Sequence, residues 1–293
     1  MLAFVILGAL LAISYPWNLP PRPTSEPSNT VIDESLTPPI TGNGEPLRIH
    51  PHFEVLEVLP HDPKAFTQGL TYDGKTNTLW EGTGNYGESE LRHVDPATGK
   101  VLASKSLHPK MFGEGISFFE SREGERRLIQ FTWKEKKGWI YHADTLDIVS
   151  EFTYETSNGD GWGITYNPNQ HEFLVTDGSP FIHFWDADTL QETKRIEVKY
   201  AQPSGAIVAV PHLNEVEYLH DGTILSNVWY QDIIIKINIE TGMVEHVYDF
   251  RPLYVDRSRG VDCFNGIAIT DKPNELWVTG KLWPHMYRIR LLH

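Results

Sequence analysis

Five polar or aromatic side chains stand at the heads of five related segments, and one of them is an acid that can transfer protons. Successive heads are 46, 48, 52 and 51 residues apart, and a short run of apolar and polar residues follows each of them. The five heads are Gln68, Glu114, Trp162, Asn214 and Asn265. A carboxyl group among amides and an indole is suited to general acid–base chemistry on a small bound group.

The repeat also predicts the elements that position these heads. A period of about 50 residues without helical patterning is typical of β-propeller blades. Each repeat contains successive β-branched and aromatic runs, with turn residues such as Asp95–Gly99 and Glu240–Gly242 between them, as expected for antiparallel strands. A β-sandwich with coincidental spacing is the alternative, but sandwiches carry turn signals without a 50-residue period.

The fifth repeat has no fourth strand before the chain ends. A spare strand, Phe53–Leu59, lies just before the first repeat, where a fourth strand precedes every other copy. We expect it to complete the last blade, which protects edge strands that would otherwise pair with other chains. The sequence therefore predicts an all-β fold, a five-bladed β-propeller over residues 50–293 whose last blade is closed by an N-terminal strand.

The N-terminal region differs from the rest of the chain. Leu2–Ile13 is almost wholly apolar, and a segment rich in Pro, Ser and Thr follows it. About 12–15 apolar residues suit a signal peptide better than a spanning helix, although a signal anchor is the alternative. We expect residues 1–17 to be one of these and residues 18–48 to form a flexible stem. Either reading places the propeller in the secretory pathway (the ER or Golgi lumen, free or anchored) or outside the cell.

Composition excludes several partners and cofactors. The formal net charge is −14 and no basic block occurs, which argues against nucleic-acid binding. The single cysteine, Cys263, permits no intrachain disulfide and is expected to be a small buried residue. No His-rich or Cys/His cluster suggests catalytic zinc. We expect a monomer without a cofactor or metal, touching membranes only through a possible N-terminal anchor.

Propeller geometry brings the candidate residues together. The first strand of each blade lines the central channel, so the five heads form a ring at one mouth. The second strands return to the same face and deliver aromatic, amide and lysine side chains. These segments are Asn85-Tyr86, Thr132–Lys134, Asp177-Gly178, Asn227–Trp229 and Lys281–Trp283. Polar groups that converge on an aromatic-walled depression are the default hypothesis for a site.

Eight strings along the propeller carry a resemblance to a known family. They are Phe66–Leu70, Phe112–Ile116, Thr132–Lys134, Gly161–Gly163, Leu213–Glu215, Asn227–Trp229, Asn265–Ala268 and Thr279–Pro284. Together they resemble the plant and bacterial, zinc-independent type of glutaminyl-peptide cyclotransferase, from about His52 to Ile289. The resemblance implies a five-bladed propeller that converts an N-terminal glutamine of a peptide or protein into pyroglutamate and releases ammonia.

The resemblance also implies roles for individual residues. Glu114 is the expected proton shuttle, since ammonia leaves poorly unless it gains a proton. Asn214 and Lys281 are the expected oxyanion donors, and Gln68 would hold the substrate's amine or amide. Asn265 is expected only to satisfy backbone groups at a strand start. The expected walls of the site, which would exclude water, are Phe66, Phe112, Trp133, Trp162 and Trp229.

Two other functions fit parts of the pattern. A calcium-dependent lactonase or esterase propeller would use Glu114, Asn214 and Asn265 as oxygen ligands around one axis, but Gln68 and Trp162 make a poor metal ring. A non-enzymatic propeller would use the aromatic face to bind peptide or sugar. Activity that is lost when Glu114 is changed would distinguish an enzyme from a binding protein. Activity that is lost on chelation would distinguish the calcium-dependent enzyme from a metal-free one.

Overall fold

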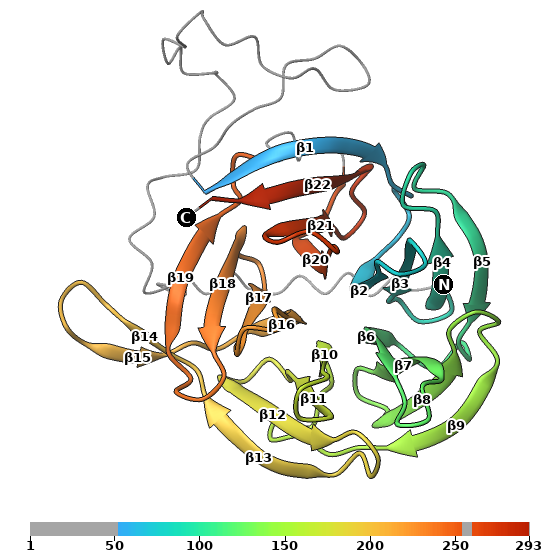
Figure 1. The fold of residues 1–293 in the computed structure, drawn as a ribbon, viewed down its shortest axis with the longest axis horizontal. Coiled ribbons are helices and arrows are strands. Elements are labelled where there is room, and N and C mark those ends of the chain that lie inside the picture. The colour runs from blue at the N-terminus through green and yellow to red at the C-terminus, as the bar shows by residue number, and fades with distance from the viewer. Residues whose placement is uncertain (1–51, 254–259, 293) are drawn as a thin grey trace, which may run out of the picture.

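The computed structural model describes residues 52–253 and 260–292. The segments predicted as signal or anchor (1–17) and stem (18–48) lie outside these residues. Five four-stranded antiparallel sheets are arranged around one axis (Figure 1). The all-β prediction and the five-bladed propeller are confirmed. No helix long and apolar enough to cross a membrane occurs in the described ranges.

Blades 1 to 4 each consist of consecutive strands, ordered from the axis outward. Blade 1 contains β2 (Thr67–Asp73), β3 (Thr78–Thr83), β4 (Glu90–Val94) and β5 (Val101–Ser106). Blade 2 contains β6 (Gly113–Glu120), β7 (Arg126–Thr132), β8 (Lys137–His142) and β9 (Ile148–Thr153). Blade 3 contains β10 (Ile164–Asn167), β11 (Glu172–Val175), β12 (Phe181–Asp186) and β13 (Glu192–Glu197). Blade 4 contains β16 (Leu213–Tyr218), β17 (Thr223–Val228), β18 (Ile233–Asn238) and β19 (Val244–Asp249).

Blade 5 joins the two ends of the propeller. Its inner strands are β20 (Phe264–Ile269), β21 (Glu275–Gly280) and β22 (His285–Leu291), and its outer strand is β1 (Phe53–Pro60). β1 pairs antiparallel with β22, in a register that sets Phe53 opposite Leu291 (Figure 1). The predicted closure by an N-terminal strand is therefore confirmed.

In four of the five repeats a glycine follows the head residue, and the close approach of the innermost strands explains it at Gly115 and Gly163. A Cβ on Gly163 would lie 2.3 Å from the carbonyl oxygen of Asn214, and one on Gly115 would lie 2.8 Å from that of Trp162. The second residue of each of these copies therefore faces the backbone of the next blade, where only a hydrogen fits. The fourth copy has Glu215 there instead, and its buried carboxylate accepts a hydrogen bond of 2.9 Å from the Leu70 backbone N–H, across the axis.

The core lies between the blades, while the outer strands face solvent. β16, β17 and β21 are buried along their whole length, whereas β9 is exposed at five of its six residues. Burial therefore decreases from the inner to the outer strands. This decrease explains why the sequences of inner strands are more continuously apolar and those of outer strands are mixed.

A hairpin, which the sequence did not predict, projects between blades 3 and 4 (Figure 1). It consists of β14 (Lys199–Ala201) and β15 (Ile207–Ala209). Ile207 in its second strand is 62 % exposed. The hairpin connects β13 to β16 and leaves the four-stranded pattern of both blades unchanged.

Candidate active site

Glu114 is the buried acid at one mouth of the central channel. It lies at the start of β6 and is 4 % exposed. The Gln68 amide, at the start of the neighbouring innermost strand β2, donates a hydrogen bond of 3.1 Å from Nε2 to Glu114 Oε1. Two of the five predicted ring positions are therefore in direct contact.

Burial raises the pKa of Glu114 well above its ordinary value. The positive charge of Lys281 acts in the opposite direction, and the negative charges of Asp160 and Glu135 add to the rise. A carboxyl group in this environment holds its proton at a pH where ordinary glutamates have lost theirs.

Lys281 follows β21 and is the cation that faces Glu114. The residue is 4 % exposed, and its Nζ lies 4.8 Å from the centroid of the Phe66 ring. Its backbone is fixed, because Lys281 N–H donates to Cys263 O at 2.9 Å and Lys281 O accepts from Asp262 N–H at 2.9 Å. Lys281 forms no ion pair within the described residues. A buried ammonium without a carboxylate partner is available to a developing negative charge.

Three of the predicted wall residues form one continuous aromatic row. The rings of Phe66 and Phe112 are 6.2 Å apart, and those of Phe112 and Trp133 are 5.5 Å apart, both edge to face. Tyr86 extends the row at the rim, 5.3 Å from Phe112. This row belongs to blades 1 and 2 and lies on the Glu114 side of the mouth.

The other two wall residues form a second pair, on blades 3 and 4. The rings of Trp162 and Trp229 lie 5.4 Å apart at 73°. His212 contacts the same Trp229 ring at 5.9 Å. Gly178, with a φ of +77°, lies under Trp162, where a Cβ would be 2.6 Å from Cζ2. Trp162 itself precedes β10, but its N–H still pairs with Thr176 O at 3.0 Å.

The two asparagines of the ring differ in their bonding. Asn265 donates from Nδ2 to the backbone oxygens of Thr67 and Gln68, at 3.1 and 3.3 Å, so its predicted structural role is confirmed. Asn214 is 3 % exposed, and its backbone oxygen accepts from Thr176 Oγ1 at 2.7 Å. Its side-chain amide forms no hydrogen bond within the described part of the chain, which leaves it free to donate.

Three of the ring heads each have a buried polar atom that lacks a partner among the described residues. They are Oε1 of Gln68 and Oδ1 of Asn265, both acceptors, and Nε1 of Trp162, a donor. Buried polar groups are nearly always hydrogen-bonded in folded proteins. The unpaired atoms indicate a polar ligand that both accepts and donates hydrogen bonds, as an amide and an amine do together.

Two carboxylates of the site were missed by sequence reasoning. Glu135 accepts hydrogen bonds from Tyr86 Oη at 2.9 Å and from Phe112 N–H at 3.3 Å. Asp160 accepts from Trp133 Nε1 at 2.9 Å. Each stands one position outside a string singled out in the sequence, Thr132–Lys134 or Gly161–Gly163. Their adjacency to those strings is the signal that could have found them.

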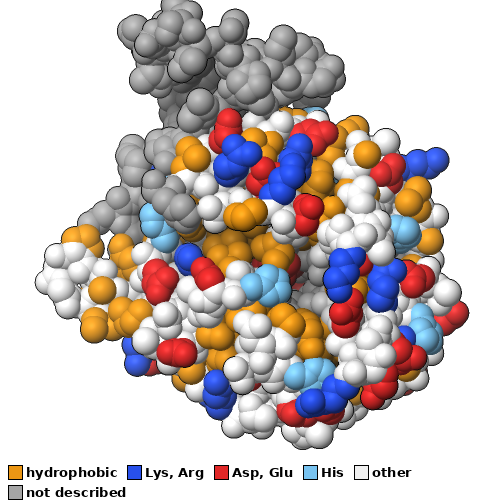
Figure 2. Space-filling model, in the orientation of Figure 1, with side chains coloured by type: hydrophobic (Ala, Val, Ile, Leu, Met, Phe, Trp, Pro, Cys, Tyr) orange, Lys and Arg blue, Asp and Glu red, His pale blue; other side chains and the backbone are white. Residues whose placement is uncertain are grey.

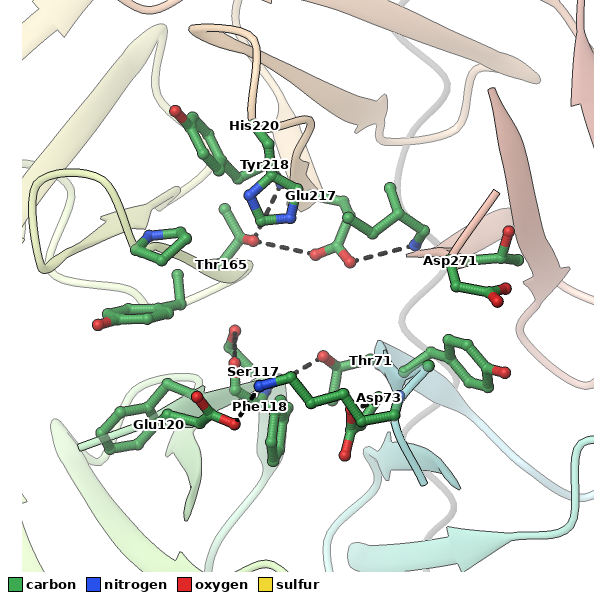
Figure 3. Close-up of a pocket in the computed structure, with 18 of the residues that line it drawn as sticks. Thr71, Asp73, Ser117, Phe118, Glu120, Thr165, Glu217, Tyr218, His220 and Asp271 are labelled. Carbon is green, nitrogen blue, oxygen red and sulfur yellow. Dashed lines mark hydrogen bonds and ion pairs between the residues drawn. The ribbon is translucent and has the colours of Figure 1, made fainter. Parts of the chain in front are cut away.

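The opposite mouth holds a cavity of about 530 Å³ that is lined by the far ends of the same innermost strands. Figure 2 shows the hollow on the ring axis, and Figure 3 shows its walls. Its buried acid, Glu217, has a pKa raised to about 8 by burial, but it accepts hydrogen bonds from Thr165 Oγ1 at 2.9 Å and Ile269 N–H at 3.2 Å (Figure 3).

We assign the candidate active site to the Glu114 mouth rather than to the cavity at the opposite mouth. The Glu114 mouth combines a buried acid with a raised pKa, an unpaired lysine and unpaired polar atoms, whereas both carboxylate oxygens of Glu217 are already bonded. In the described ranges, no group of three or more His, Cys, Asp or Glu is placed to hold a metal ion.

Comparison with known proteins identifies one family. The family model of glutamine cyclotransferase matches residues 39–291. A glutaminyl-peptide cyclotransferase of Arabidopsis thaliana is 36% identical over 242 residues, which cover 81% of this chain and 71% of the relative. The crystal structure of Myxococcus xanthus glutaminyl cyclase matches with a TM-score of 0.69 at 27% identity, covering 82% of this chain and 96% of that one. The chain forms a five-bladed propeller with a buried acid at one mouth, and the family model matches nearly all of that propeller. The chain therefore belongs to the glutamine cyclotransferase family.

Proposed function

We propose that this protein is a glutaminyl-peptide cyclotransferase, which converts the N-terminal glutamine of peptides or proteins into pyroglutamate and releases ammonia. The observation that carries the proposal is the buried Glu114 carboxyl group, bonded to Gln68 and facing the unpaired Lys281. Family membership supports it, as do the names of the Arabidopsis and Myxococcus relatives.

The reaction needs one new bond, one broken bond and one transferred proton. The α-nitrogen forms a bond to the side-chain Cδ, the carboxamide C–N bond breaks, and its nitrogen leaves as ammonia. An α-amine has a pKa of about 7.7–8.0, so a useful fraction is neutral near neutral pH. Glu114 takes a proton from the attacking nitrogen and gives one to the departing nitrogen, since a single carboxyl group can do both in turn.

Lys281 and Asn214 stabilise the oxygen that becomes negative during attack. The Lys281 ammonium forms no ion pair and the Asn214 side-chain amide forms no hydrogen bond among the described residues, so neither must first break such a bond. Donors fixed before the reaction lower the barrier without reorganisation at the moment of attack. Oε1 of Gln68 accepts a hydrogen bond from the substrate's amine or amide.

The aromatic walls fold the glutamine side chain into a reactive shape and exclude water. Both reacting groups belong to one residue, so holding that residue in a near-attack conformation is the main task of the site. The row Phe66–Phe112–Trp133 and the pair Trp162–Trp229 come from different blades and enclose the mouth. Water kept out of the site cannot hydrolyse the amide in competition with the amine.

Ammonia release from a glutamine-initiated dipeptide amide tests the proposal. The full chain is assayed with and without a strong chelator, beside Glu114→Gln and beside Glu120→Gln, whose carboxylate pairs with Lys75 at the other mouth. We expect activity that survives chelation, collapses in Glu114→Gln and persists in Glu120→Gln. Activity lost on chelation would support the calcium-dependent alternative. Folded wild type without activity would support the binding propeller.

The site is expected to tolerate different residues after the glutamine, because only the glutamine side chain must be buried. Tyr86, 52 % exposed at the rim, leaves the mouth open on its side. A series of glutamine peptides that differ at the second and third residues should have similar kcat/KM. A strong dependence on those residues would contradict this part of the proposal.

We further propose that the enzyme is monomeric and acts in the secretory pathway or outside the cell. Residues 1–17 serve as a signal peptide or anchor, and residues 18–48 as a stem. The apolar run Leu2–Ile13 and the Pro-, Ser- and Thr-rich segment after it support this location. Expression of the tagged full chain, followed by cell fractionation and N-terminal analysis, separates a cleaved product from an anchored one. A product that stays in the cytosol would overturn the assignment.

A further inference from the structure

Two hydrogen bonds join the loop before β10 to the residue that follows β7, beside the Glu114 mouth. Trp133 Nε1–H donates to Asp160 Oδ2 at 2.9 Å, and Gly161 N–H donates to Trp133 O at 2.8 Å. Trp133 belongs to blade 2, and residues 160–161 lead into blade 3. Because the first bond is made by the indole itself, it fixes the ring orientation and not only the backbone.

Both partners of the indole bond are themselves held in place. The backbone oxygen of Asp160 accepts from Thr156 Oγ1 at 2.6 Å. Trp133 N–H donates to Phe112 O at 2.9 Å, and the Lys134 ammonium lies 3.8 Å from the centroid of the indole. An indole with an ammonium over its ring and a carboxylate on its N–H has little freedom to turn.

The orientation of Trp133 is transmitted to the acid through contacts between rings. Trp133 packs edge to face on Phe112, 5.5 Å away. Phe112 and Gln68 approach Gly84 together, since a Cβ there would lie 2.5 Å from Phe112 Cε1 and 3.1 Å from Gln68 Cγ. Gln68 in turn bonds Glu114. If the Trp133 ring turned, Phe112 would lose its packing partner. Phe112 would then shift against Gln68, which orients Glu114.

We propose that Asp160 is a positioning residue of the cyclotransferase site, which fixes the indole of Trp133 through the Nε1–H···Oδ2 hydrogen bond. This inference rests on the proposed function. No part of the reaction touches Asp160 directly; it acts through the ring that walls the substrate's side chain.

Asp160 also has an electrostatic effect, which an experiment must separate from the hydrogen bond. Its charge, like that of Glu135, raises the pKa of Glu114, against the effect of Lys281. Asp160→Asn keeps an oxygen that accepts from the indole but removes the charge, whereas Asp160→Ala removes both. Trp133→Phe removes the N–H donor and leaves Asp160 in place.

Activity of these variants on a glutamine dipeptide amide is the first measurement. We expect kcat/KM to fall about 10- to 100-fold in Asp160→Ala, mainly through kcat, because a charge-assisted hydrogen bond that orients the wall is lost. At the pH optimum of each variant, Asp160→Asn should stay within about 3-fold of wild type. Asp160→Ala combined with Trp133→Phe should be no worse than the poorer single variant, because both remove the same interaction.

A control and a readout without substrate complete the test. Glu155→Gln removes a nearby surface carboxylate that pairs with Lys136, and should leave activity unchanged. The indole N–H resonance of Trp133 is identified by its absence in Trp133→Phe. Its protection from hydrogen exchange should be kept in Asp160→Asn and lost in Asp160→Ala.

The outcomes distinguish this inference from the function on which it rests. If wild type is active but Asp160→Ala has normal kcat/KM, or if the double variant shows additive losses, the positioning role is wrong and the function stands. If wild type is inactive on glutamine peptides, the proposed function fails. In that case unchanged exchange protection in Asp160→Ala overturns the Trp133–Asp160 contact as well.

Discussion

Gln68 Nε2 and Glu114 Oε1 are joined by a hydrogen bond of 3.1 Å between the innermost strands of two neighbouring blades. Glu114 Oε2 has no hydrogen-bond partner within the described ranges. The amide therefore occupies one carboxyl oxygen and leaves the other for the substrate. The relative position of the two strand starts therefore sets the orientation of the Glu114 carboxyl group, the proposed proton shuttle.

Gln68→Met tests this relationship. Methionine has a similar length but no N–H, so the Glu114 carboxyl loses the donor that orients it. We expect kcat/KM to fall about 10-fold, with little change in thermal stability. The measurement is steady-state ammonia release beside thermal unfolding. Full activity in a folded variant would show that the bond does not orient the acid.

Glu135→Gln should move the pH dependence of kcat/KM. The negative charge of Glu135 raises the pKa of Glu114, so removing that charge lowers this pKa, and the limb that reports Glu114 moves to lower pH. The single oxygen of glutamine can accept from Phe112 N–H while its NH2 group donates to the Tyr86 oxygen, so both contacts of the wall are kept. The substrate's α-amine titrates in the same way with either enzyme, so it contributes equally to the pH profiles of wild type and Glu135→Gln. Glu245→Gln, on the outer strand β19, is the matched control and should cause no shift.

Gly178→Ala should impair catalysis through Trp162. The new methyl group would lie 2.6 Å from the Trp162 ring, at a φ of +77°. Gly222→Ala is the matched control, because its φ is +83° and nothing lies within 4 Å of its Cβ position. Both should lose about 1–2 kcal/mol of unfolding free energy through the left-handed backbone. Only Gly178→Ala should also lose about 10- to 100-fold in kcat/KM, since the wall is displaced.

His61 should make the stability of the closed ring depend on pH. Burial lowers the pKa of His61, but the charge and hydrogen bond of Glu81, 2.8 Å away, act with the Trp283 backbone oxygen and the charge of Asp62 to raise the pKa above 6.5. A raised pKa gives stability that is fully present below pH 6.5 and lost as pH rises through the folded-state pKa. Glu81 is 1 % exposed and belongs to blade 1, while His61 directly follows β1.

The matching variant is His61→Gln, which stays neutral at every pH. Its unfolding free energy should be about 2 kcal/mol below wild type at pH 5.5–6, and the difference should shrink toward alkaline pH. Denaturant unfolding of both proteins across this range checks the sign. A difference that does not change with pH would mean that His61 is not charged in the folded state.

Much of the fold could be predicted, because one physical constraint recurs in the sequence. Where innermost strands touch at the axis, a glycine such as Gly115 or Gly163 recurs at the same place in the repeat. The hairpin β14–β15 could not be predicted in this way. It has no counterpart in the other repeats, and its apolar residues resemble a prolonged outer strand.

The ring heads of the site were predictable for the same reason, since they start the inner strands. Glu135 and Asp160 were not, because both lie in loops and owe their position to one tertiary hydrogen bond each, to Tyr86 or to Trp133. The bonding of Asn265 to backbone oxygens was predictable from its place at a strand start. The absence of an ion pair at Lys281 among the described residues was not predictable, because it depends on which carboxylates the other blades place beside this lysine.

Because β1 pairs with β22, with Phe53 opposite Leu291, the ring can close only late in the synthesis of the chain. β1 is the first described strand to leave the ribosome, and β22 is the last, so β1 must wait for almost the whole chain before it has a partner. Until then it is an open strand edge, able to pair with another nascent chain. Gln68 and Glu114 are brought together by the first two blades, but Lys281 joins them only with the fifth. The nascent chain therefore carries an incomplete site until the ring closes.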